Sequence, residues 1–148
     1  MTPRVELVRE LAAVPRLLGM AARNAPPPPD GEWSAREVVC HLIAVEGEAW
    51  HVRLDSLWEA TDEPQWVWTE PGPWDGRGSE TLETALLTFG TRRAATIERL
   101  TRLDAAGWRR TGLHPTFGRQ DVGAVMQTAL DHDREHIQAL RARSGIAG

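Results

Sequence analysis

The sequence predicts an all-α protein, a four-helix bundle, and three observations lead to this prediction. Apolar residues recur at three- and four-residue steps over long stretches of the chain. Two irregular connections rich in Pro, Gly or polar residues interrupt these stretches. No stretch shows the strict alternation that predicts a half-buried strand. Because the chain has 148 residues, the usual size of one domain, residues 1–148 are expected to form a single bundle.

The first helix is expected from Pro3 to about Asn24. Pro15 lies inside this pattern and should kink or divide the helix, because proline cannot donate the backbone hydrogen bond. The run Pro26–Pro29 should end it and form an extended linker. The apolar positions that define this helix are Val5, Val8, Leu11, Ala12, Val14, Leu17 and Leu18.

The second helix has the clearest predicted start. Ser34 and Glu37 match a capping box, and Trp33 can pack back on Val38 as a hydrophobic staple. The helix is expected to last to about Ala60. One face of it carries Val38, His41, Leu42, Val45, Ala49 and Val52.

A long loop rich in Trp, Pro and Gly is predicted between helices two and three, from Thr61 to Ser79. Trp66, Trp68 and Trp74 lie in it. They could cover the mouth of a site, line a pocket for an apolar substrate or bury a subunit contact. The favoured interpretation is that they fold the loop onto the bundle.

The third helix is expected from an N-cap at Ser79 to about Leu103. A second loop, Thr111–Gly118, then leads to Asp121, a plausible N-cap for a fourth helix that runs to about Arg143. The third helix is defined by Leu82, Leu86, Phe89, Arg93, Ile97 and Leu100, and the fourth by Val122, Val125, Ala129, His132, His136 and Ala139 or Leu140.

Composition excludes several classes of protein. The formal net charge of −4 and scattered arginines argue against nucleic-acid binding. No apolar run is long enough to span a bilayer, so no membrane segment is expected. Cys40 is the only cysteine, which rules out an internal disulfide and favours a reducing, cytoplasmic location.

Three histidines predict a metal site. His132 and His136 are four residues apart, so they share one helix face one turn apart. His41 lies in the equivalent apolar stripe of the second helix. Three neutral imidazoles can hold a divalent ion and leave a position open for water or substrate, as in catalytic sites. The alternative is that each is a core histidine with its own hydrogen bonds, and the spacing alone leaves both open.

Other polar residues have more ordinary interpretations. His51 is expected at the surface, because ten residues rotate it away from His41. His114, before Pro115, should shape a turn. Glu48 lies two helical turns after His41 on the same face of the helix and could act as a base near the site. Glu46 lies off the apolar stripe that contains His41.

Asp131 and Asp133 flank His132 but should point elsewhere. A solvated face is the favoured role, and orienting a histidine on a neighbouring helix is the alternative. Cys40 is expected to be a small buried hydrophobe. Trp50 and Trp58 are expected in the core or at the end of the bundle.

Two segments resemble signatures of the DinB-like (DinB/YfiT) superfamily. Trp33–Leu42 (WSAREVVCHL) with Glu46 resembles its second-helix signature. His114–Gly118 (HPTFG) with Asp131–Gln138 (DHDREHIQ) resembles its final signature. The resemblance covers most of the chain, because the pieces occur in the same order and with similar spacing.

The resemblance implies a four-helix bundle, often dimeric, that holds a divalent ion such as Zn or Ni. By motif match the ligands are His41, His132 and His136. Related proteins include thiol-dependent isomerases, thiol S-transferases and hydrolases. The expected function is therefore a metal-dependent enzyme that activates water or a low-molecular-weight thiol, acting on a small-molecule substrate as a homodimer. The alternative is a non-catalytic bundle that binds a ligand or partner, in which the histidines stabilise the core.

Overall fold

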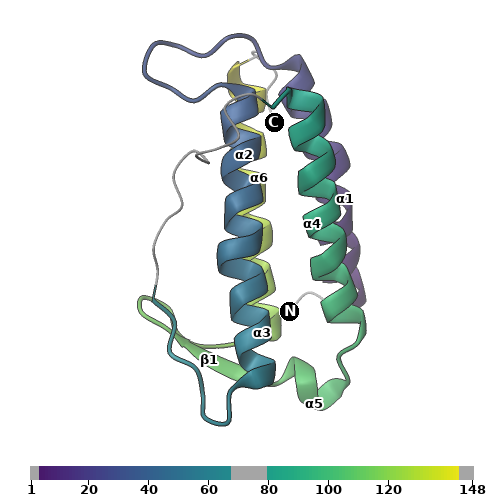
Figure 1. Cartoon of the computed structure of the whole chain (residues 1–148), viewed down its shortest axis with the longest axis vertical. Helices are drawn as coiled ribbons and strands as arrows, with labels where there is room; N and C mark the ends of the chain where they lie inside the picture. The colour runs from purple at the N-terminus through teal and green to yellow at the C-terminus, as the bar shows by residue number, and fades with distance from the viewer. Residues whose placement is uncertain (1–3, 68–79, 144–148) are drawn as a thin grey trace.

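Four long helices lie side by side along the long axis of the molecule (Figure 1), which confirms the predicted all-α bundle. The computed structural model describes residues 4–67 and 80–143. The second long helix consists of three consecutive segments. The helical elements are α1 (Arg4–Asn24), α2 (Ala35–Val45), η1 (Glu46–His51), α3 (Val52–Glu59), α4 (Leu82–Thr101), the short α5 (Ala105–Trp108) and α6 (Val122–Arg143).

The first and last long helices of the sequence pack against each other. α1 packs against α6 and α4, and α4 packs against α2. Figure 1 shows α6 directly behind α2 and α1 behind α4. α2 and α4 run in the same direction, because α4 starts again at the end where α2 starts. The backbones of α2 and α6 approach each other less closely than those of the other neighbours, which leaves room between them for side chains.

The predicted capping box starts the second helix. The Oγ of Ser34 accepts a hydrogen bond from the Glu37 backbone N–H, and Oε1 of Glu37 accepts one from the Ser34 N–H, both at 3.1 Å. At α4 the cap is Thr81, whose Oγ1 accepts from the Thr84 N–H. α4 therefore begins later than predicted, and Ser79 lies outside the described residues.

Pro15 does not divide the first helix, so that part of the prediction is wrong. α1 is one α-helix of 21 residues with Pro15 inside it. The apolar residues Leu11, Val14 and Leu18 on both sides of the proline are buried against the other helices. Tertiary packing thus compensates for the backbone hydrogen bond that proline cannot donate.

The second long helix contains a π-helical segment, η1, that a regular period does not predict. A π-turn takes up one more residue than an α-turn, so side chains after it point in different directions from those expected. As a result Glu48, within the segment, is exposed, whereas Glu46, its first residue, is buried. At the junction the carbonyl of Ile43 accepts a hydrogen bond from Nη1 of Arg92, at 2.7 Å, which ties the segment to α4.

The second predicted loop is a small β-hairpin. β1 (Thr111–His114) pairs antiparallel with β2 (Gly118–Asp121). Strands of four residues are too short to show a reliable alternation in sequence, which explains why the hairpin was not predicted. Asp121 caps α6 as predicted, because its Oδ1 accepts from the Ala124 N–H at 2.8 Å.

Trp66 attaches the start of the long loop to this hairpin. Its backbone N–H donates to the Leu113 carbonyl, its indole Nε1 donates to Oγ of Ser56 at 2.9 Å, and only 8% of the residue is exposed. Trp66 therefore packs onto the bundle, as the favoured interpretation expected. Trp68 and Trp74 lie outside the described residues. In the parts that are described, no helix combines the length and apolar character needed to cross a membrane.

Gly112 is expected to be required for this attachment. A Cβ at Gly112 would lie 2.2 Å from Cζ2 of the Trp66 ring, so Gly112→Ala should destabilise the protein by about 1–3 kcal/mol through overpacking. Gly90 in α4 is the matched control: a Cβ there meets nothing within 4 Å, and Gly90→Ala should stabilise by about 0.5–1 kcal/mol. Urea unfolding of the two variants measures both, and equal effects would contradict the expectation.

Candidate metal centre

The structure brings together the three histidines that the sequence selected. His41 comes from α2, and His132 and His136 come from consecutive turns of α6. One ring nitrogen from each histidine lies within 4.8 Å of those of the other two. His41 is completely buried, whereas His132 and His136 are partly exposed at the edge of the core. The cluster lies between α2 and α6, where the separation of the two backbones leaves space for side chains.

Aromatic side chains surround the cluster. The Trp33 ring lies 4.9 Å from the His41 ring, and the Trp50 ring lies edge-on to His132 at 6.3 Å between centroids. Two cavities adjoin the cluster: His136 lines one of about 300 Å³ and His132 lines one of about 480 Å³. The imidazoles therefore have packed walls and two routes by which a small molecule could approach.

The donor set fits a divalent ion. Burial, and then the charges of His136 and His41, lower the pKa of His132 to about 4, so this imidazole is neutral near pH 7. Neutral imidazole is the form that binds a metal. Among the described residues the buried Nδ1 of His132 has no hydrogen-bond partner. A core histidine that only supports the fold would be expected to have its nitrogens hydrogen-bonded, which argues against the purely structural alternative for this residue.

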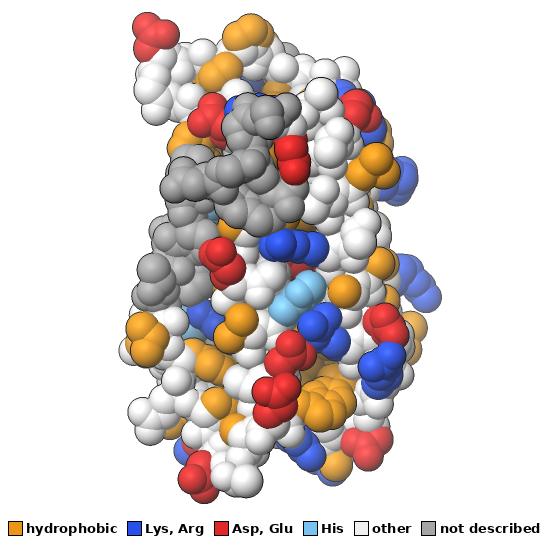
Figure 2. All heavy atoms as spheres, in the orientation of Figure 1, with side chains coloured by type: hydrophobic (Ala, Val, Ile, Leu, Met, Phe, Trp, Pro, Cys, Tyr) orange, Lys and Arg blue, Asp and Glu red, His pale blue; other side chains and the backbone are white. Residues whose placement is uncertain are grey.

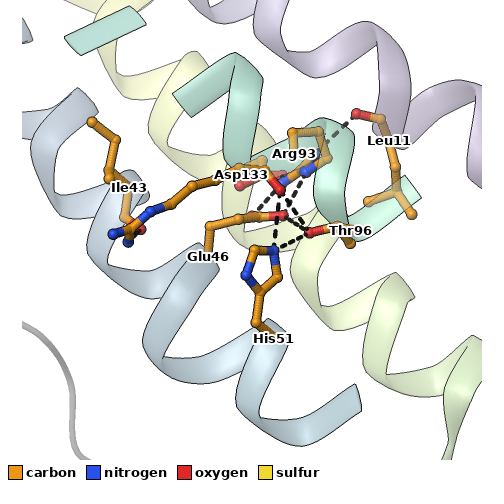
Figure 3. Close-up of polar contacts among 8 residues, drawn as sticks. Leu11, Ile43, Glu46, His51, Arg93, Thr96 and Asp133 are labelled. Carbon is orange, nitrogen blue, oxygen red and sulfur yellow. Dashed lines mark hydrogen bonds and ion pairs between the residues drawn. The ribbon is translucent and has the colours of Figure 1, made fainter. Parts of the chain in front are cut away.

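A buried ionic network lies deeper in the bundle (Figure 3), and we call it the Arg93 network. Arg93 of α4 donates from Nε and Nη2 to both carboxylate oxygens of Glu46, at 2.8 and 2.7 Å. Nη2 also donates to Oδ2 of Asp133 at 2.6 Å, and Nη1 donates to the Leu11 carbonyl at 3.0 Å. Arg93, Glu46 and Asp133 are each about 1% exposed. A single guanidinium thus connects all four long helices.

The network continues from Glu46 toward the surface through two further side chains. Thr96 donates its hydroxyl proton to Oε2 of Glu46. Nε2 of His51 lies 3.0 Å from the Arg92 carbonyl and 2.8 Å from Oγ1 of Thr96. Because a carbonyl can only accept, this nitrogen of His51 carries a proton. A continuous chain of hydrogen bonds therefore joins the half-buried His51 to Glu46 and Arg93.

Two carboxylates share one guanidinium in this network, and the pKa values of Asp133 and Arg93 are shifted. Burial raises the pKa of Asp133 to about 7, and the charge of Glu46 adds to the rise, while Arg93 opposes it. Burial alone would lower the pKa of Arg93, but hydrogen bonds to Glu46 and the charges of both acids hold it above its usual range. Arg93 is therefore always charged, and Asp133 titrates near neutral pH.

Some other sequence predictions are confirmed. His114 shapes a turn, because its Nδ1 accepts from the backbone N–H groups of Thr116 and Phe117, at 2.9 and 3.0 Å. Asp131 is exposed, and Cys40 is a buried small side chain.

The two tryptophans of the second long helix differ from each other. Trp50 is in the core. Trp58, at the end of the same long helix, is 47% exposed.

Three polar residues differ from expectation, and the π-segment explains two of them. His51 faces α4 instead of solvent, and Glu48 faces solvent instead of the site. Glu46, for which only a position off the His41 stripe was expected, contacts Arg93 of α4 and is buried. The expectation of a solvated face is wrong for Asp133, because Met126, Leu130, Asp133, Ile137 and Leu140 form a second buried line on α6.

A sequence signal for the network exists at Arg93. It occupies a position of the apolar stripe of α4, between Phe89 and Ile97. A charged residue at a core position requires a buried partner of opposite charge. The same reasoning applies to Asp133 in α6, so the pair could have been predicted from the two helical patterns together.

Asp133 and His132 are expected to give opposing pH dependences of stability in metal-free protein. The folded state keeps the Asp133 proton up to about pH 7, so this residue lowers stability as pH rises from about 4 to 7. The folded state keeps His132 neutral down to about pH 4, so the stability it contributes above pH 6.5 is lost as pH falls. Between about pH 4 and 6.5 the two effects offset each other.

Asp133→Asn should remove one of these effects and reveal the other. Relative to wild type, the free energy of unfolding of Asp133→Asn should fall as pH falls from 6.5 to 4, by at most about 1.4 kcal/mol per pH unit. Urea unfolding with a chelator present, at several pH values in this range, measures the difference. A difference between the two proteins that does not change with pH would contradict the assignment.

Comparisons with known proteins agree with this architecture. The model of the DinB superfamily matches residues 8–140. The solved structure of YfiT from Bacillus subtilis, described as a probable metal-dependent hydrolase with an unusual four-helix bundle topology, matches with a TM-score of 0.77. The sequences are 19% identical, and the match covers 97% of this chain and 89% of that one, so the likeness concerns the fold. No curated protein matches the sequence.

Proposed function

This chain belongs to the DinB superfamily, and we propose that it is a divalent-metal-dependent enzyme whose ion is held by His41, His132 and His136. The observation that carries the proposal is the convergence of one nitrogen from each imidazole within 4.8 Å. Zinc or nickel suits an all-imidazole site. A divalent ion bound there would supply Lewis-acid chemistry that lowers the pKa of water or of a low-molecular-weight thiol.

The chain's own residues prepare this site in three ways. Burial keeps His132 neutral, as a ligand must be. Trp33 and Trp50 pack against the imidazoles and restrict their orientation. Asp133, next to His132 on α6, is fixed by Arg93 of α4 and so limits rotation of α6 about its own axis. These contacts support the proposal that the three imidazoles are arranged before an ion binds.

Water and a thiol are the two candidate nucleophiles. Hydrolysis is supported by the description of YfiT as a probable metal-dependent hydrolase. Thiol chemistry is supported only by the resemblance of the sequence signatures. A small-molecule substrate can approach from either cavity, next to His132 or His136. Assembly as a homodimer and a cytoplasmic location stay predictions.

Elemental analysis of protein purified without a histidine tag tests the shared premise. We expect about one zinc or nickel ion per chain, and re-addition of the metal to chelated protein should raise Tm, because a ligand that binds only the folded state stabilises it. Cobalt substitution then separates the two nucleophiles, since a thiol that reaches the ion produces a charge-transfer band. Wild type without stoichiometric metal, and with a Tm that added metal leaves unchanged, would refute the proposal in favour of a non-catalytic bundle.

A further inference from the structure

Two of the three distances within the histidine cluster depend on how α2 and α6 are placed relative to each other. The centroids of the His132 and His136 rings are 4.7 Å apart, and the regular helix that carries both residues sets this distance. The His41 ring lies 5.6 Å from the His132 ring and 5.1 Å from the His136 ring, across the two helices. Any change in the separation or rotation of α2 and α6 therefore changes the cluster.

The side chain of Arg93 joins these two helices from a third one. The backbones of α2 and α6 are farther apart than those of other neighbouring helices, so direct packing constrains them less. α4 packs against α2, and its Arg93 guanidinium also reaches α6. Nε and Nη2 donate to the two carboxylate oxygens of Glu46, which directly follows α2, and Nη2 donates to Oδ2 of Asp133 (Figure 3). The planar guanidinium fixes the directions of these bonds.

The two carboxylates are connected to the imidazoles by the helices that carry them. Asp133 is adjacent to His132, so its side chain points about 100° away from His132 around α6. Glu46 lies five residues after His41 and points about 140° away from it around the same long helix. The two acids therefore face α4 while the imidazoles face each other. Holding both acids on one guanidinium fixes the rotation of both helices, and with it the directions of the imidazoles.

A second side chain of α4 holds Glu46 in place. Thr96 lies three residues after Arg93 and donates its hydroxyl proton to Oε2 of Glu46. Arg93, Thr96, Glu46 and Asp133 are each about 1% exposed, so water does not compete for these bonds. Hydrogen bonds in such a buried setting are stronger than they are in water. The Arg93 network can therefore maintain a defined geometry in addition to neutralising charge.

We propose that Arg93, Glu46, Asp133 and Thr96 are positioning residues of the metal centre. They set the separation and rotation of α2 and α6 that bring His41 to the two histidines of α6. The inference rests on the proposed function, because it concerns the same centre, and it deepens that function by naming residues that act on the ligands from outside. The geometry and metal affinity of the centre then depend on the fork of the guanidinium, and not only on the stability that the network contributes.

Arg93→Lys tests the role of the fork. Lysine keeps the positive charge, but its single ammonium group cannot reproduce the bidentate contact with Glu46 together with the bond to Asp133. We expect zinc affinity, measured by competition with a chelator, to fall about tenfold, as for loss of an outer-shell partner. The ligand-field spectrum of cobalt-loaded protein should change as well, because it reports the arrangement of the ligands. Thr96→Val removes only the hydroxyl and should give a smaller change in the same direction.

Two further variants separate positioning from stability, once circular dichroism shows that each is folded. Gly112→Ala disturbs Trp66 at the hairpin, so it should lower stability and leave zinc affinity and the cobalt spectrum unchanged. The triple variant Glu46→Gln, Arg93→Met and Asp133→Asn should be more stable than Arg93→Met alone, because it carries no unpaired buried acid. Its zinc affinity should nevertheless stay low. Zinc affinity that simply follows stability across these variants would overturn the inference.

The imidazole NMR signals of metal-free protein give a second readout that needs no bound ion. Tryptophan rings lie against two of the three cluster histidines, so ring currents make these signals sensitive to small displacements. Arg93→Lys should shift the signals of the cluster histidines. The signal of His114, which lies in the hairpin turn outside the network, should stay in place.

The outcomes separate this inference from the proposed function. Wild type that binds zinc through the three histidines, with an affinity, a cobalt spectrum and imidazole signals that Arg93→Lys leaves unchanged, would overturn the inference alone. Wild type that binds no metal, but whose cluster signals shift in Arg93→Lys, would overturn the proposed function and support the positioning of the imidazoles. Wild type that binds no metal, with signals that do not shift in the variant, would overturn both.

Discussion

Replacing Arg93 by methionine is expected to destabilise the protein by about 3–5 kcal/mol, because it leaves buried carboxylates without their cation. Arg93 is 1% exposed and bridges Glu46 and Asp133, which are equally buried. The Leu11 carbonyl would lose its side-chain donor as well. Some of the cost is avoided if Asp133 takes up a proton, since its pKa is already raised to about 7.

Urea unfolding of Arg93→Met measures this loss. Arg99→Met is the matched control, because Arg99 forms a partly exposed ion pair with Asp55 and its removal should cost at most about 1 kcal/mol. Adding Glu46→Gln and Asp133→Asn to Arg93→Met replaces the two buried carboxylates that have lost their cation with neutral amides, which should restore part of the stability. If Arg93→Met costs no more than Arg99→Met, the network does not hold the bundle together.

Replacing His136 by alanine is expected to reduce metal affinity more than about 100-fold, which exceeds the usual cost of losing an outer-shell partner. The substitution removes one of three ligands from a site that has no fourth protein ligand among the described residues. His136 is partly exposed, so its truncation leaves the buried core intact. The variant should fold but purify with little bound metal.

Tryptophan fluorescence gives an independent measurement of the same loss. Trp33 and Trp50 lie next to His41 and His132, so binding of cobalt or nickel should quench part of the emission of wild type. His136→Ala should abolish this quenching at equal metal concentration. His114→Ala, which removes an imidazole outside the cluster, should retain it. Equal quenching in wild type and His136→Ala would refute the ligand assignment.

The sequence predicted the parts of the structure that depend on regular helical periodicity. The bundle, the capping box at Ser34 and the meeting of His41 with His132 and His136 all follow from residues spaced three or four apart on regular α-helix. His41 precedes the π-segment, and the other two histidines lie on an uninterrupted helix. The prediction succeeded because no irregular turn intervenes within either element.

The predicted side-chain directions of Glu48 and His51, past Val45, were wrong, although the helix extends to Glu59 as expected. The orientations expected for Glu48 and His51 assumed an equal rotation per residue, which the π-segment does not follow. Asp133 was missed for another reason, since its burial depends on Arg93, forty residues away in sequence. A single-helix pattern cannot reveal a partner on a different helix.

The π-segment at Glu46–His51 has a consequence for comparing this chain with its relatives. In evolutionary terms it is equivalent to one residue inserted into an ordinary helix. The sequence of a relative that lacks this extra residue would align with this chain on both sides of the segment only if a one-residue gap were placed within it. Deletion of one residue here would turn the rest of the helix by about 100° and bring Asp55 and Trp58 to the buried positions of Leu54 and Leu57. The length of this segment therefore determines which residues of α3 enter the core.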